Sequence, residues 1–354
     1  MKTIARVIAS AILLLLTGLM LAFAKAAPDV VFSFYSDFSR AALRAIGTVT
    51  GLLPIAVWEV LAALLILWLV YTFIRIFTKR RSLLAWLCGV LLAVCTGIFL
   101  FVGLWGLNHF GPSVDQTLGL DVREYSKQEL TAATAYYAAQ LNDCSAAVER
   151  GEDALAVMPD FSELAAHAAD GYAQLAGTYE LFADVTGPVK PLASWRLFSQ
   201  TGTTGIFICF TAESCVNPDT YSAWLPFTMC HELAHRQAVA AEDGANFCAY
   251  LACMASPEAV FRYSGAYGAY IYCHNALSKV DQAAAAQIWN TLSPGALADI
   301  RAANAHYAQY EGKVQDAAQK VNDTYLKAFS EESGVQSYGE VADLLIAWYL
   351  KQTA

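Results

Sequence analysis

Three long stretches of apolar residues lie in the first third of the chain, and they restrict its fold more than any other feature. They cover about residues 7–24, 51–74 and 82–107. Each is long enough to cross about 30 Å of hydrocarbon as a helix. In a bilayer, only helices and closed barrels satisfy all backbone polar groups. We therefore expect three transmembrane helices within residues 1–111, and hence a lipid bilayer as a partner.

The composition supports this expectation. The chain is 57% hydrophobic and 15% charged, which is too apolar for an ordinary soluble enzyme. Its net charge of −9 leaves no basic stripe to meet phosphates, so nucleic acid is excluded as a partner.

Basic residues set the expected orientation. Lys2 and Arg6 lie at the first apolar stretch, and a basic cluster, Arg75 and 79–81, lies between the second and third. The positive-inside rule places both groups in the cytoplasm, so residues 112–354 should be extracytoplasmic. A small-residue site at Ala24–Ala26 leaves cleavage as a signal peptide open. We favour retention because two more spans follow.

The extracytoplasmic part carries the pentad His231–His235, which has the pattern H-E-x-x-H. Two histidines four residues apart lie on one face of a helix. Their imidazoles can reach one Zn²⁺ and leave a position open for water. Glu232 is placed to take a proton from that water. Pro226 before the pentad favours a helix, whereas Arg236 puts a charge where a buried site would prefer a neutral residue.

A tetrahedral catalytic zinc site needs a third protein ligand. Glu242 can supply it if a second helix starts near Ala241. Asp243 is the rival ligand, but it is shorter and points about 100° away on a helix. Asn246 lies one turn beyond Glu242 on the same face and could orient a ligand. The alternative interpretation of both acids is a solvated helix start favoured by the helix dipole.

These residues resemble a bacterial family called domain of unknown function 3810, whose members look like membrane-anchored zinc peptidases. The resemblance rests on Leu225–His235, Glu242–Phe247 and Ala249–Leu251, and it extends to Gly205–Phe207, Phe261–Gly265 and Val335–Gly339. It covers most of the chain, including the membrane segments. The element E-x-x-A-N at Glu242 also resembles the third-ligand helix of gluzincin-type peptidases, which implies Glu242 as the ligand.

Two positions depart from the pattern of the family. Gly244 stands where an acid is usual, and Gln237-Ala238 stand where a glycine is usual nearby. Gly244 leaves Glu242 as the only glutamate of this element.

A peptidase also needs a donor for the oxyanion that develops on the attacked carbonyl. The candidates are Arg262, Tyr263, His274 and Tyr338. The sequence alone does not rank them, but the resemblance favours Arg262, Tyr263 and Tyr338 over His274. Packing in the core is the alternative role for each tyrosine.

Helical signals dominate the rest of the chain. Ser126–Glu129 is a capping box and predicts a helix over residues 130–141. We expect further helices over about 160–183, from 256 onward, over 296–330 and over 338–350. Ile206–Phe210 is the best strand candidate, and it could bind an extended substrate or be part of a structural hairpin. Gly187–Pro191 predicts a loop, and Glu213 and Asn217 should lie in a loop that could line a cleft.

The nine cysteines give a weaker signal. Cys209 and Cys215 are the closest pair across a turn, and disulfides are possible outside the cytoplasm. The chain near the pentad has no C-x-x-C spacing, so we interpret its cysteines as small buried apolar groups.

The sequence thus predicts a mostly α-helical protein. Residues 1–111 form a three-helix transmembrane region, and residues 112–354 form an extracytoplasmic, zincin-like domain with a small β element. The expected function is a Zn²⁺-dependent metallopeptidase in the bacterial cell membrane, with a peptide or protein substrate. The alternatives are a non-catalytic membrane receptor that uses the zinc-site domain to bind a ligand, and a structural protein with an accidental motif.

Overall fold

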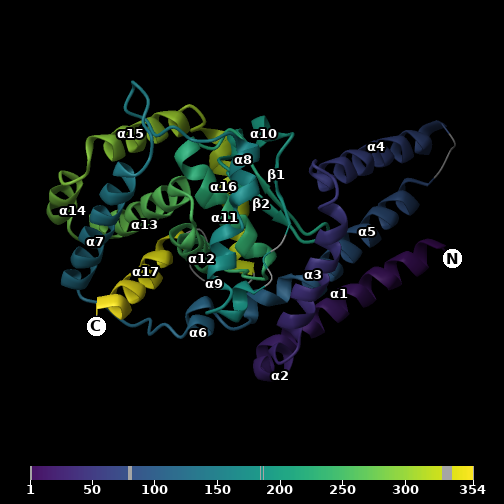
Figure 1. The fold of residues 1–354 in the computed structure, drawn as a ribbon. Coiled ribbons are helices and arrows are strands. Elements are labelled where there is room, and N and C mark those ends of the chain that lie inside the picture. Colours follow the sequence, from purple (N-terminus) through teal and green to yellow (C-terminus); the bar gives the residue numbers. More distant parts are fainter. Residues whose placement is uncertain (1, 79–81, 184, 186, 329–336, 354) are drawn as a thin grey trace. The chain divides into compact units, whose positions relative to one another are not determined.

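Helices account for most of the computed structural model, which describes residues 2–78, 82–183, 185, 187–328 and 337–353 (Figure 1). The chain divides into two units. The first consists of residues 1–111 and 208–213, and the second of residues 112–207 and 214–354. Three apolar N-terminal helices and one small three-stranded sheet are present, so the predicted mostly helical fold with a minor β element is confirmed.

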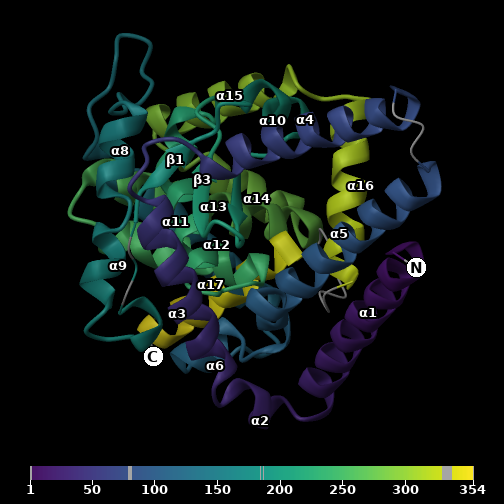
Figure 2. The same ribbon diagram turned by 90° about the vertical axis from the view of Figure 1, so that its right-hand side faces the viewer.

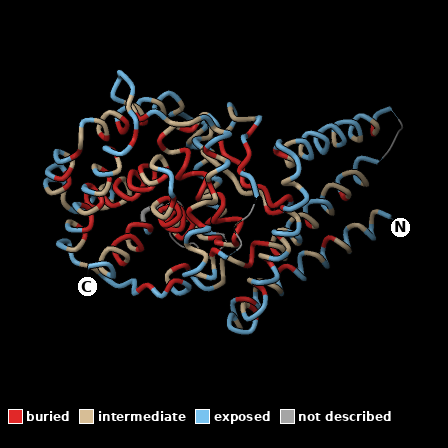
Figure 3. The backbone as a smooth tube through the Cα atoms, in the orientation of Figure 1, coloured by how far each residue is buried: buried red, intermediate tan, exposed pale blue. Residues whose placement is uncertain are grey.

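Three helices of the first unit are long and apolar enough to cross a membrane. They are α1 (Lys2–Ala26), α4 (Val57–Thr78) and α5 (Leu83–Leu104). Near their starts, Arg6 Nη1 of α1 donates to the Ala85 carbonyl of α5 at 2.6 Å. At the other end, Lys25 Nζ lies 5.0 Å from the ring centroid of Phe110, just beyond α5. The helices α1 and α5 therefore run in the same direction. The side chains of α4 are mostly exposed (Figure 3).

The connection from α1 to α4 is helical, which the sequence reasoning does not predict. It contains α2 (Pro28–Phe32) and α3 (Tyr35–Thr50). The next helix, α4, begins at Val57 because the Glu213 carboxylate accepts hydrogen bonds from the Val57 and Trp58 backbone N–H groups, at 2.8 and 2.9 Å. Glu213 lies in a strand and caps this helix, so its predicted place in a loop is wrong.

The second unit is built around one buried helix. That helix is α12 (Glu242–Ala255), whose residues from Gly244 to Cys253 are all buried. It packs against α9 (Asp170–Leu175), α11 (Leu225–Arg236), α13 (Ala259–Val280) and α17 (Ser337–Thr353), as Figure 2 shows from a second side. The remaining helices are α6 (Val114–Leu118), α7 (Lys127–Ala146), α8 (Phe161–His167), α10 (Trp195–Thr201), α14 (Gln282–Trp289), α15 (Pro294–Ala308) and α16 (Lys313–Ala328), with short 3₁₀ turns at Gly106–Phe110, Glu180–Phe182 and Ser222–Trp224.

Two long predicted helices are broken in the structure. The expected helix over 160–183 starts correctly after the cap Asp160, but it splits into α8, α9 and a 3₁₀ turn. The break lets Gly171 of α9 lie directly on the backbone of α12. The expected helix over 296–330 splits into α15 and α16 next to Gly312, which has a positive φ of 156°. Apolar spacing alone does not reveal either break.

The sheet has three short strands, where the sequence predicts one. They are β1 (Val189–Pro191), β2 (Gly205–Ile208) and β3 (Glu213–Val216), in the order β1-β3-β2. The strands β1 and β3 are parallel, with Val189 opposite Ser214. The prediction of a loop over Gly187–Pro191 is therefore wrong for Val189–Pro191, which form β1. Pro191 cannot donate to a ladder, which suits its place in an edge strand.

All nine cysteines are free thiols, and none of them forms the possible Cys209–Cys215 disulfide. Eight are buried and Cys144 is half-buried. Their burial agrees with their interpretation as small apolar groups.

Gly171→Ala is expected to destabilise the second unit by about 2–3 kcal/mol. A Cβ at this position would overlap the Ala252 carbonyl oxygen and lie 2.6 Å from its carbonyl carbon. Backbone atoms of a buried helix cannot move aside cheaply, and this cost exceeds the better helix propensity of alanine. Thermal unfolding of the purified chain measures the effect. Gly177→Ala is the matched control because a Cβ there meets nothing within 4 Å. Equal melting temperatures for the two variants would contradict the prediction.

Candidate metal centre

Two histidine side chains of α11 face each other one turn apart. The helix follows a 3₁₀ turn and carries Pro226 in its first turn, where the missing N–H costs nothing. The spacing of four residues brings His231 Nε2 and His235 Nε2 to 3.0 Å. His235 is buried and His231 is nearly so. The ring nitrogens most suited to a metal therefore point at one place.

Glu242 completes the cluster from the start of α12. The helix begins at this residue with Ala241 as its N-cap, as the sequence predicts. The Glu242 carboxylate oxygens lie 3.3 Å from His231 Nε2 and 3.8 Å from His235 Nε2. Among the described residues, the potential metal-ligand group contains these three side chains and does not include the rival Asp243.

The separations fit a tetrahedral ion. Zinc bonds of 2.0–2.1 Å to nitrogen and oxygen give ligand-to-ligand edges of about 3.3 Å in a tetrahedron. The three edges here are 3.0, 3.3 and 3.8 Å. Two imidazoles and one carboxylate are also the donor set of a known class of catalytic zinc sites, with one position left for water. His231, His235 and Glu242 can therefore hold Zn²⁺ with little rearrangement.

The other ring nitrogen of each histidine meets an oxygen. His231 Nδ1 lies 2.9 Å from Asn246 Oδ1, and His235 Nδ1 lies 2.7 Å from the Val239 carbonyl. Both oxygens can accept a hydrogen bond, so they favour the tautomer with the proton on Nδ1, which leaves the Nε2 lone pair for a metal. Asn246 reaches the His231 ring because it lies one turn beyond Glu242 on the same face of α12.

The end of α11 explains one departure from the family pattern. Ala238 has a left-handed φ of 66°, a conformation that glycine adopts most easily. Around it, Ala238 N donates to the His235 carbonyl at 3.0 Å and Val239 N donates to the Ala234 carbonyl at 3.2 Å, which is a Schellman motif. The motif turns the Val239 carbonyl back toward His235. The turn needs a positive φ, which is a physical reason to expect a glycine near this position.

The other two unusual positions are Gly244 and Arg236, and each lies against a neighbouring residue. A Cβ on Gly244 would lie 2.7 Å from Val114 Cγ2, so this chain has no room for an acid there. Arg236 is buried, with its guanidinium against the backbone of Gly187.

Glu232 is the proton-accepting candidate beside the cluster. Its side chain is only 4% exposed, and its Oε2 has no hydrogen-bond partner within the part of the chain that the structure describes. Burial raises the pKa of this carboxyl to about 8; His231 lowers the pKa and Glu242 raises it. The main chain at Glu232 is held by Ser214 of β3, whose Oγ donates to the Glu232 carbonyl at 2.7 Å.

Gly205 of β2 lies directly against this carboxylate. A Cβ on Gly205 would overlap Glu232 Oε1 and lie 2.8 Å from both Cγ and Cδ of that side chain. The absence of a side chain at residue 205 therefore gives Glu232 its place. The contact joins residues 27 positions apart, and no local pattern reveals it.

Tyr272 is a second residue that the sequence reasoning misses. It lies on α13, and its hydroxyl donates to Asn246 Oδ1 at 3.1 Å. Asn246 Oδ1 therefore accepts from both Tyr272 and His231. These two donors hold the amide with its oxygen toward the histidine.

Two of the predicted oxyanion donors, Tyr263 and Arg262, form hydrogen bonds with other groups, and the side chain of a third, Tyr338, lies outside the described residues. Tyr263 is fully buried and donates to Asp299 Oδ2 at 2.5 Å, while Arg262 Nη1 donates to the Ser256 and Pro257 carbonyls at 2.7 and 2.6 Å. Tyr338 lies in the first turn of α17, but its side chain lies outside the described residues.

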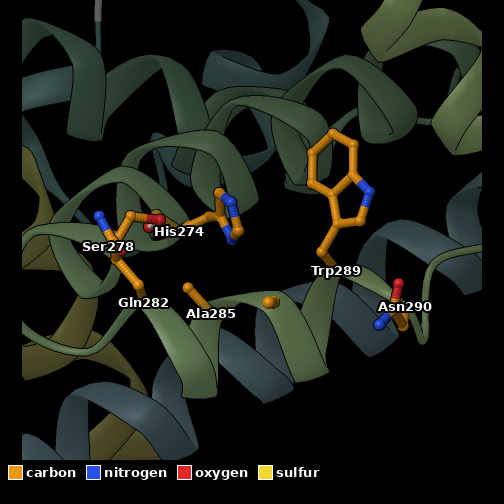
Figure 4. Close-up of a pocket in the computed structure, with 7 residues that line it drawn as sticks. His274, Ser278, Gln282, Ala285, Trp289 and Asn290 are labelled. Atoms are coloured by element: carbon orange, nitrogen blue, oxygen red, sulfur yellow. Dashed lines mark hydrogen bonds between the residues drawn. The ribbon is translucent and has the colours of Figure 1, made fainter.

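His274 lies apart from the cluster residues, in a separate surface pocket. The cavity, of about 370 Å³, is lined by side chains of α13 and α14 and contains none of the cluster residues (Figure 4). Figure 4 shows the His274 and Trp289 rings over this pocket. Their ring centroids are 5.5 Å apart. None of the four predicted donors has a described contact with the metal-ligand group.

Asn246→Ala is expected to weaken zinc binding by about 10- to 100-fold. The change removes the acceptor that fixes the ring orientation and tautomer of His231. Competition against a chromophoric chelator measures the affinity. Tyr272→Phe is the control: it removes the other donor on the same oxygen but keeps the His231 contact, so we expect a smaller loss. A wild-type affinity for Asn246→Ala would show that the amide does not orient the ligand.

One family matches the chain. It is described as a protein of unknown function (DUF3810), and the match covers residues 34–346, which include the three potential metal ligands His231, His235 and Glu242. No curated protein and no solved structure matches the chain.

Proposed function

We propose that this chain, which belongs to the DUF3810 family, is a membrane-anchored zinc metallopeptidase with a zincin-like catalytic domain. One observation carries the proposal: His231, His235 and Glu242 converge within 4.8 Å, with the Glu232 carboxylate on the same helix as the histidines. A metal-ligand triad with an adjacent buried base is the arrangement used for hydrolysis.

The chain's own residues divide the chemistry between them. His231, His235 and Glu242 would hold Zn²⁺, which would supply a Lewis acid for the scissile carbonyl and lower the pKa of a water molecule toward neutrality. Glu232 accepts a proton from the attacking water and passes it to the leaving amine. Burial raises the pKa of this carboxyl, which strengthens the carboxylate as a proton acceptor and lowers its ionised fraction at neutral pH.

An extended peptide is the substrate that the surroundings of Glu232 favour. β2 is at one end of the sheet order β1-β3-β2, so one of its edges pairs with no strand among the described residues of that sheet. Gly205, the first residue of β2, touches Glu232. A peptide that pairs with this edge would place its backbone beside the base, by the strand-addition mode of peptide recognition.

The helices of the first unit support an extracytoplasmic location for residues 112–354. α1 and α5 run in the same direction, and α4 lies between them along the chain. If all three cross the bilayer, residues 112–354 emerge on the side opposite the N-terminus, which supports this location. The basic residues Lys2, Arg6 and Arg75 assign the N-terminal side to the cytoplasm. The substrate is therefore an extracytoplasmic peptide or protein.

The test uses the full chain purified in detergent. We expect about one zinc per chain by metal analysis and cleavage of internal bonds in a mixed library of quenched fluorescent peptides. A chelator should stop the cleavage, and added Zn²⁺ should restore it. Zinc without any cleavage above the Glu232→Gln background would favour a non-catalytic receptor. A folded chain without bound metal would exclude both roles.

A further inference from the structure

The helix α3 of the first unit has three faces, whereas a helix on a soluble protein usually has two. One face is buried and carries Tyr35, Ser39, Leu43 and Gly47, which are spaced four residues apart. A second face is polar, with exposed Asp37, Arg44 and Thr48 and half-buried Arg40 on it. A third face lies between these two on the other side of the helix, and it is exposed and apolar.

The third face continues beyond the helix. Phe34, Phe38 and Val49 are 58%, 55% and 67% exposed and stand whole turns apart, with Ala45 between them. The segment that follows adds Leu52, Leu53 and Ile55, which are 80%, 50% and 52% exposed. We call these residues the apolar face of α3. Large exposed apolar patches of this kind mark interaction surfaces.

Hydrogen bonds place α3 at the end of an apolar span. Tyr35 Oη donates to the Val102 carbonyl at 3.2 Å, and Ser39 Oγ donates to the Leu104 carbonyl at 2.8 Å. Both carbonyls belong to the last turn of α5, and Trp105 follows at once. The long apolar helix α5 ends at this turn, so the turn marks the level at which the span leaves the hydrocarbon. The first residues of α3 therefore lie at that level.

We propose that α3 is an interfacial helix whose apolar face rests in the lipid leaflet at the ends of α1 and α5. Phe34, Phe38 and Val49 contact acyl chains, while Arg40 and Arg44 on the polar face reach the phosphate headgroups. This is the arrangement of an amphipathic helix that lies in the plane of the interface. The inference rests on the membrane location and is independent of the peptidase activity.

A bilayer explains the apolar face better than a second protein does. The exposed side chains of the spans, such as Leu65 of α4 and Leu100 of α5, are 52% and 50% exposed and also need an apolar solvent. α3 joins α1 to α4 along the chain, so the bilayer that covers the spans reaches it without a further partner. On the polar face, Arg40 forms an ion pair with Asp37 at 2.6 Å, so this face carries charged groups that suit the headgroup region.

Site-specific photocrosslinking in the full chain tests the proposal. p-Benzoylphenylalanine is placed at Phe38, at Val49, at Thr48 on the polar face and at Leu65 within α4 as a positive control. Each variant is reconstituted in vesicles of phosphatidylethanolamine and phosphatidylglycerol that contain an alkyne-tagged phospholipid. We expect lipid adducts at residues 38 and 49 that approach the yield at 65 and exceed the yield at 48 several-fold.

Two results would overturn the proposal. Equal lipid labelling at positions 38 and 48, with strong labelling at 65, would show that α3 does not lie in the interface. Crosslinks from residue 38 to another polypeptide, including a second copy of the chain, would show that a protein covers the apolar face. Loss of peptidase activity in any variant leaves the lipid readout unchanged, so the two proposals fail independently.

Discussion

Glu232→Gln is expected to abolish peptide hydrolysis and to leave zinc bound. The amide has nearly the same shape as the carboxylate, so the packing around this buried side chain is preserved. It cannot accept a proton from water, and loss of general base catalysis costs about 10²- to 10⁴-fold in rate. The ligands His231, His235 and Glu242 are untouched. Initial rates on the best library peptide, together with metal analysis of the same sample, measure both effects.

His231→Ala is the matched comparison because it removes a ligand on the same helix. We expect both the zinc and the activity to be lost, which separates metal binding from proton transfer. The assignment of Glu232 is wrong if the glutamine variant keeps more than about a tenth of the wild-type rate, since that loss is below the range expected for a general base. Retention of zinc by His231→Ala at wild-type affinity would remove the ligand assignment itself.

The features that follow from local sequence are predicted well. The pentad His231–His235 requires only that the chain be helical, because helix geometry then puts both imidazoles on one side. The start of a second helix at Glu242 follows in the same way. The three long apolar helices are predictable because continuous apolar residues have few other solutions than a membrane helix.

The features that depend on contacts between distant residues are not predictable from one sequence. Glu213 reads as a polar loop residue, yet it caps α4 more than 150 positions earlier in the chain. The amphipathic helix α3 escapes a search for spans because Asp37, Arg40 and Arg44 interrupt its apolar residues. Its buried face can be identified only in the folded structure, where α5 lies beside it.

The same limit applies to the surroundings of the metal cluster. Asn246 is predictable because it shares a helix face with Glu242, whereas Tyr272 reaches the same amide from another helix. Tyr263 is a chemically reasonable oxyanion donor by residue type, but Asp299 takes its hydroxyl in the core. Residue type shows what a side chain can do, and packing decides which of those roles remains open to it.

Gly205→Ala is expected to lower kcat/KM by about 10²- to 10⁴-fold, nearly as much as loss of the base itself. The new Cβ would overlap Glu232 Oε1, so the carboxylate must leave its position beside the metal ligands. The backbone at Gly205 is not among the described residues with a positive φ, so alanine itself introduces no strain. Zinc content should stay at the wild-type level because none of the three ligands is touched.

Gly177→Ala is the control for this change, since it adds the same methyl group in open space. It should keep both zinc and activity, and the melting temperatures of the two variants should differ little because Gly205 is only half-buried. Full activity in Gly205→Ala would mean that Glu232 works from a different position. Loss of zinc together with activity would mean that β2 supports the ligands rather than the base. Only an inactive protein with its zinc in place agrees with a strand that positions the proton acceptor.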